Sequence, residues 1–115
     1  MTDMEPPEHL GDEERAEWER LHNVLGLRGD WRPKFYPMIE MWCSQWGLLV
    51  QAVNEFTDHG GELLLTDDHG KTYWHPALEV AEDTAKLLRE IAADMLFDPQ
   101  IVDRRIAAVM RPLTT

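Results

Sequence analysis

Three things are scarce in this 115-residue chain: cysteine, long apolar runs and positive charge. Cys43 is the one cysteine, so no disulfide can form within the chain, which fits a reducing compartment. No apolar run reaches the roughly eighteen residues that a membrane-spanning helix needs. Lysine and arginine together number 11 against 22 aspartates and glutamates, for a formal net charge of -11. This charge argues against a protein that simply coats nucleic acid, although a local basic patch can still bind DNA.

Apolar residues at helical spacing are what the chain has in quantity. Two sets recur every three or four residues, so each set falls along one side of a long helix. Two such helices joined by a short glycine-containing connection are expected to fold back on each other. Their apolar faces are wide, which favours assembly of several copies. The sets are Phe35, Ile39, Trp42, Trp46, Leu49, Val50, Val53 and Phe56, then Ala77, Val80, Ala81, Thr84, Leu87, Leu88, Ile91 and Met95.

The acidic N-terminus sets the expected domain limits. Residues 1–11 contain two prolines and several acids, which predicts a disordered segment, and residues 12–111 are expected to form one helical domain. The segment lacks the basic and apolar regions of a signal peptide, so we expect a cytoplasmic protein. A short first helix is predicted from a cap at Asp12 to a stop at Gly26.

Turn residues and prolines in the second half of the chain complete the predicted fold. Residues 62–74 contain three leucines, the turn set DDHG and then Thr-Tyr-Trp, which is typical of a small β-hairpin. Pro76 and Pro99 each follow a possible capping residue and predict the start of a helix. The predicted fold class is mainly α: an antiparallel helical hairpin with a short N-terminal helix, a small β-hairpin between the long helices and a short C-terminal helix.

Four segments follow one another in a recognisable order: AEWERLHNVLGL, FYPMIEMWCSQW, HGKTYWHPALEVAEDTAKLLREIAADM and FDPQIVDRRI. Over residues 12–108 this order resembles the small terminase subunit of tailed bacteriophages, in the class with a hairpin between two long helices. Its short form is also similar to the small terminases of gene transfer agents. The resemblance implies a non-enzymatic, ring-forming protein without a cofactor. Such a protein binds viral DNA in the cytoplasm of the host bacterium and delivers it to the large subunit, which holds the ATPase and nuclease.

The densest basic patch gives the candidate DNA contacts. Arg28, Arg32 and Lys34 lie close together with Trp31 between them, so they can bind phosphates while the indole stacks or wedges. The alternative is an ordinary solvated connector whose tryptophan packs on the core. The sequence leans toward that alternative, because short charge clusters predict sites weakly.

The candidate subunit interface combines aromatic and basic residues. Phe35 and Tyr36, near the start of the long helix, are favoured as interface anchors, with Trp46 on the same helix as a further candidate. Arg104 and Arg105 on the last helix can contact DNA or pair with an acidic face of the neighbouring subunit. The alternatives are a core position for Trp46 and local ion pairs for the arginines, each worth about 0–1 kcal/mol.

Metal and catalytic motifs do not emerge. Cys43 and the scattered histidines match no compact zinc spacing. Asp67 and Asp68 can hold Mg²⁺ in principle but are better explained as turn residues. The segment Gly70-Lys71-Thr72 lacks the earlier glycine of a phosphate-binding loop. We therefore predict a protein that is not an enzyme and needs no metal.

Two other functions remain open at this point. The first is an acidic helical adaptor or DNA mimic that binds a basic partner and never touches DNA, which the net charge supports more than it supports DNA binding. The second is a small metal-dependent enzyme. Binding to duplex DNA at low salt separates the packaging function from the mimic.

Overall fold

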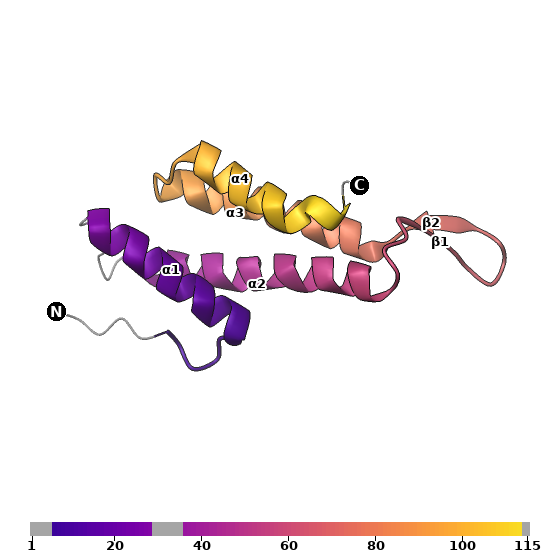
Figure 1. Cartoon of the computed structure of the whole chain (residues 1–115), viewed down its shortest axis with the longest axis horizontal. Helices are drawn as coiled ribbons and strands as arrows, with labels where there is room; N and C mark the ends of the chain where they lie inside the picture. The colour runs from indigo at the N-terminus through magenta and orange to yellow at the C-terminus, as the bar shows by residue number, and fades with distance from the viewer. Residues whose placement is uncertain (1–5, 29–35, 114–115) are drawn as a thin grey trace. The chain divides into compact units, whose positions relative to one another are not determined.

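The computed structural model describes residues 6–28 and 36–113, except for the side chains of residues 24–28. The described elements follow the order α1 (Asp12–Arg28), α2 (Tyr36–Asp58), β1 (Leu64–Thr66), β2 (Thr72–Trp74), α3 (Pro76–Asp94), α4 (Pro99–Met110) and a final 3₁₀ turn, η2 (Arg111–Leu113) (Figure 1). The prediction of a mainly helical chain with a small β-hairpin between its long helices is confirmed. The chain divides into two compact units, Met1–Gly47 and Leu48–Thr115, and α2 runs through the boundary between them.

The first unit contains α1 and the first half of α2. The backbone N–H of Arg15 donates to the carbonyl of Gly11 at 2.9 Å, so Gly11 is the capping residue and Asp12 begins the acidic first turn. The predicted cap at Asp12 was thus one residue late. The helix also continues past Gly26 to Arg28, because a glycine permits a helix end without imposing one and costs only about 1 kcal/mol inside a helix.

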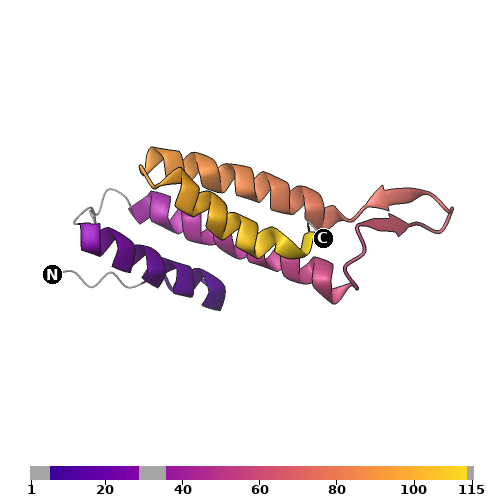
Figure 2. The ribbon, with the colours of Figure 1, turned by 45° about the horizontal axis from the view of Figure 1, so that its top comes forward.

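The β-hairpin belongs to the second unit and is closed by Asp67. Its strands pair antiparallel, with Leu64 opposite Trp74 and Thr66 opposite Thr72. One carboxylate oxygen of Asp67 accepts from the backbone N–H groups of His69 and Lys71, each at 2.9 Å, and its carbonyl accepts from Gly70. Gly70 has φ +80, the left-handed conformation that a three-residue hairpin loop of this kind requires. In both views the hairpin projects away from the helices of this unit (Figure 2).

Helices α3 and α4 pack side by side in the second unit (Figures 1 and 2). Both begin with a capping side chain followed by proline, as the sequence predicts. His75 Nδ1 accepts from the N–H of Ala77 at 3.0 Å, and an Asp98 carboxylate oxygen accepts from Gln100 at 2.9 Å. The proline in the first helical position loses no hydrogen bond there, because that N–H has no partner within the helix.

The turn between α3 and α4 is built around a strained leucine. Leu96 has φ +60, a conformation that glycine adopts at little cost and a leucine rarely adopts. Its N–H donates to the carbonyl of Ala93, and the N–H of Phe97 donates to Ala92, which together form a Schellman motif at the end of α3. Leu96 occupies the position where helices favour glycine, and its side chain is 80% exposed.

Replacing Leu96 with glycine should therefore stabilise the protein by about 0.5–1 kcal/mol. The positive φ costs a leucine about 1–2 kcal/mol, the greater entropy that glycine loses on folding offsets about 0.5–1 kcal/mol of the gain, and no buried contact is lost. Urea denaturation followed by circular dichroism measures the change. A Leu96→Ala variant is the matched control: it removes the same exposed side chain but keeps the Cβ that makes a positive φ costly. Equal stabilities for the glycine and alanine variants would contradict this explanation.

The predicted apolar faces of the long helices are mostly covered within a single chain. On α2, Ile39, Trp42 and Leu49 are at most 1% exposed, and Trp46, Val53 and Phe56 are also buried. The width of these apolar faces therefore does not by itself require several copies of the chain. Val80 of the second face is an exception, at 44% exposed. The other exposed large apolar residues among those described are Met41, Leu48, Leu64, Tyr73, Trp74, Leu96 and Ile101. Within residues 6–28 and 36–113, no helix has the length and apolar character to cross a bilayer.

Candidate functional site

The predicted DNA contacts fall almost wholly outside the described residues. Trp31, Arg32 and Lys34 lie between the two described ranges, and Arg28 is the last residue of α1, with a side chain that is not among those described. The basic patch therefore stays a prediction from the sequence.

Of the three predicted aromatic interface residues, the structure describes Tyr36 and Trp46. Phe35 lies outside the described residues. Tyr36 is half-buried, with its ring 6.2 Å from that of Trp18 in an edge-on contact. Trp46 is 4% exposed and stacks on Trp42 with 6.3 Å between ring centroids, so it sits in the core of its own chain.

The two predicted interface arginines are on α4 in the second unit. Arg104 is exposed and Arg105 is half-buried. Nearby, Arg89 of α3 donates to Asp103 of α4 at 2.9 Å, an exposed pair that links the two helices. Arg104 makes no ion pair with any side chain that the structure describes.

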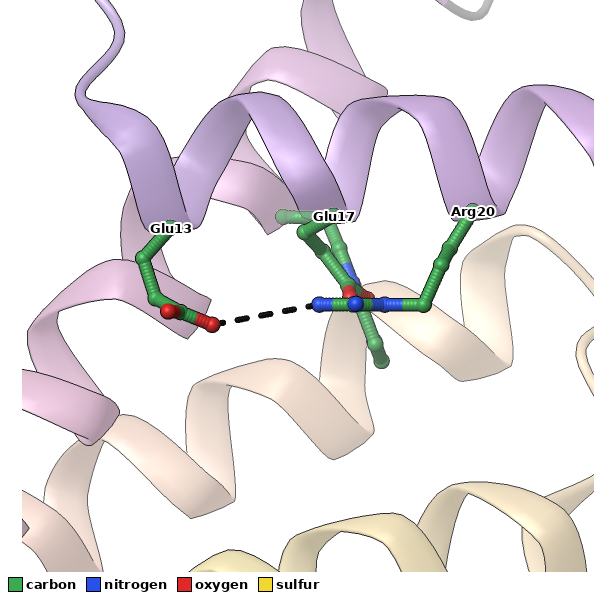
Figure 3. Close-up of polar contacts among 4 residues, drawn as sticks. Glu13, Glu17 and Arg20 are labelled. Carbon is green, nitrogen blue, oxygen red and sulfur yellow. Dashed lines mark hydrogen bonds and ion pairs between the residues drawn. The ribbon is translucent and has the colours of Figure 1, made fainter.

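A buried carboxylate organises the first unit. Glu17 is completely covered, and its oxygens accept from the indole Nε1 of Trp42 at 2.6 Å and from Arg20 Nε at 2.8 Å. The Arg20 guanidinium also reaches Glu13 across 3.9 Å (Figure 3). A buried charge is costly unless it is paired and hydrogen-bonded, and here both conditions are met. This arrangement fastens α1 to the first half of α2.

Sequence reasoning missed Glu17 as a structural residue. The available signal was its position four residues before the buried Leu21, which places both side chains on one face of α1. A glutamate at the edge of an apolar face suggests a buried partner. However, nothing in the sequence identifies that partner as Trp42, 25 residues away.

Cys43 is buried and chemically quiet. Its side chain is fully covered, and burial together with the negative charges of Glu17 and Glu14 raises the pKa of the thiol to about 12. Since the thiolate is the nucleophile and the metal ligand, burial and these charges disfavour both roles at neutral pH. Among the described residues, no group of three or more His, Cys, Asp or Glu side chains is placed to hold a metal ion. The Asp67 carboxylate accepts hydrogen bonds within the hairpin turn, in agreement with its interpretation as a turn residue.

A groove lies in the second unit where β2 joins α3. It has a volume of about 380 Å³ and is lined by Trp74, Pro76, Leu78, Glu79, Glu82 and Asp83, among others. Trp74 is 65% exposed, and the three acidic side chains are exposed as well. An indole face beside several carboxylates attracts a cation, because the ring quadrupole and the carboxylates act in the same direction.

Comparison with protein families gives one finding. The family model described as phage terminase, small subunit, matches residues 15–108. The comparisons with curated proteins and with solved structures gave no match. The matched range begins in the first turn of α1 and ends near the end of α4, so it includes the hairpin, both long helices and the buried Glu17 contact.

Proposed function

Because the chain belongs to the phage terminase small-subunit family, we propose that it is the DNA-recognition and regulatory subunit of a viral packaging motor. In this function it performs no chemistry itself. It assembles with itself into a ring, binds double-stranded DNA and presents that DNA to a large subunit carrying the ATPase and nuclease, in the cytoplasm of the host bacterium. The family match over residues 15–108 is the observation that carries the proposal.

The charge distribution suggests how such a subunit binds DNA. The net charge of -11 repels the duplex, whereas the patch Arg28, Trp31, Arg32 and Lys34 attracts it. One patch gives weak binding, but a ring presents one patch per copy, so several patches can contact the same duplex at a high effective concentration. The acidic remainder then suppresses nonspecific adhesion and makes binding depend on assembly.

Duplex DNA binding measured by fluorescence anisotropy across a series of salt concentrations tests the proposal. We expect binding at low salt that weakens steeply as salt rises, since each phosphate contact adds about 0.9 to the slope of log K against log salt. Addition of the large subunit should give a ternary complex and a changed ATPase rate. No DNA binding at the lowest salt, for protein shown to be assembled by light scattering, would contradict the proposed DNA recognition.

The acidic surface also supports a second candidate, a DNA mimic that binds a basic partner. Exposed carboxylates at Glu79, Glu82 and Asp83 lie on one helix, which is the kind of surface that such a protein presents. The same titration separates the two functions. A mimic stays unbound to DNA at every salt concentration and instead competes with DNA for a basic protein.

A further inference from the structure

The groove at the start of α3 concentrates negative charge: three carboxylates line it, and Lys86, one turn after Glu82 and Asp83, is the nearest basic residue along the helix. Glu79, Glu82 and Asp83 follow the spacing i, i+3 and i+4, so they lie on neighbouring positions of the helix surface. None of them makes an ion pair with a side chain in the part of the chain that the structure describes. Three like charges at this spacing repel one another, and a cation placed among them relieves the repulsion.

The exposed indole of Trp74 favours one kind of cation over another. Trp74 is 65% exposed, and its cross-strand partner Leu64 is 51% exposed, so an apolar surface borders the carboxylates. A guanidinium fits this combination better than an ammonium, because it is planar, stacks on an indole and donates two parallel hydrogen bonds to a carboxylate. The groove is therefore suited to an arginine carried on a partly apolar surface.

Helix α4 carries such an arginine. Arg104 is exposed, and Ile101 lies one turn before it with 52% of its side chain exposed. The pair thus offers a cation beside an apolar anchor, which complements carboxylates beside an indole. Because Arg104 and the acidic groove both lack an ion-pair partner among the described side chains, each can serve the other between two copies.

We propose that the groove of one copy receives Arg104 of a neighbouring copy, with Ile101 packing against Trp74 and Leu64. This deepens the proposed function and depends on it, since it names the contact that joins subunits in the ring. Groove and arginine are different surfaces, so the contact is head-to-tail. Each copy then contacts one neighbour through its groove and the other neighbour through its α4. In a closed ring every groove and every Arg104 is therefore paired.

A charge exchange tests the contact. Assembly of the full chain is followed by analytical ultracentrifugation over a range of concentrations, and folding of each variant is checked by circular dichroism. Glu82→Arg and Arg104→Glu should each raise the concentration needed for assembly by at least about tenfold. The double variant, which carries both changes, should assemble at a lower concentration than Arg104→Glu alone, because the arginine introduced at position 82 can pair with the glutamate introduced at position 104. Recovery should be partial, because Glu79 and Asp83 still repel that glutamate.

Three further variants separate the groove from a general charge effect. Trp74→Ala should weaken assembly by at least about tenfold, whereas Trp74→Phe, which keeps an aromatic face, should weaken it much less. Asp94→Lys makes an acidic-to-basic change at the other end of α3, on an exposed residue outside the groove, and should leave assembly unchanged.

Three results overturn the inference. Assembly of Trp74→Ala and Arg104→Glu like the unaltered chain would show that the contact lies elsewhere, while leaving the ring and its DNA binding intact. A double variant that fails to recover would show that the groove and Arg104 do not meet. A chain that stays monomeric at every concentration would remove the ring as well, and the anisotropy titration would then decide separately whether DNA recognition stands.

Discussion

Replacing Trp42 with alanine should lower the free energy of unfolding by about 3–5 kcal/mol, the range for truncating a buried tryptophan. The side chain is 1% exposed, stacks on Trp46 and donates to the buried carboxylate of Glu17. The alanine variant loses the packing and also leaves a buried charge with one donor fewer. Since small domains have a total stability of about 5–15 kcal/mol, the variant should lose a large share of its stability.

Two further variants separate the contribution of the hydrogen bond from that of the packing. Trp42→Phe keeps most of the ring and removes the indole donor, so it should cost about 1–3 kcal/mol. Adding Glu17→Met to Trp42→Phe should recover part of that loss, because the carboxylate that needed the donor is gone. Urea denaturation followed by circular dichroism at one protein concentration gives the values, since the stability of an assembling protein depends on concentration. Losses below about 1 kcal/mol for Trp42→Ala would contradict the anchoring role of this contact.

Removing the basic patch should weaken DNA binding strongly. In a variant with alanine at Arg28, Arg32 and Lys34, we expect the affinity for duplex DNA at low salt to fall by at least about tenfold. The slope of log K against log salt should decrease by about 3 for each patch that contacts the duplex. Anisotropy titrations of both proteins at matched salt concentrations measure the two quantities.

A charge-matched control is available in the second unit. Lys71, Lys86 and Arg89 are exposed. Replacing both lysines with alanine and Arg89 with glutamine removes the same number of positive charges outside the patch, while the glutamine amide can still donate to Asp103. This variant should lose only a small part of the affinity, through the general increase in negative charge. If the two triple variants lose affinity equally, the patch is not the DNA contact, and only the overall charge matters.

The proline, glycine and capping residues predicted most of the secondary structure from the sequence. Pro76 and Pro99 mark the starts of α3 and α4, and the DDHG turn marks the hairpin, because these residues act through local backbone geometry that a short segment determines alone. The exceptions were equally local. Gly26 lies inside α1 rather than at its end, and Leu96 takes a conformation for which glycine is the usual choice.

By itself, then, the sequence determined the helical class, the position of the hairpin and the excess of negative charge, since periodicity, turn chemistry and composition depend on near neighbours along the chain. Only the tertiary structure decided which apolar faces are covered, that Glu17 is buried against Trp42, that Cys43 is fully buried and that Trp74 lines one groove with three carboxylates at the start of α3. Burial depends on which distant segments come together, and the sequence shows the same glutamate whether its carboxylate accepts hydrogen bonds from water or from an indole N–H.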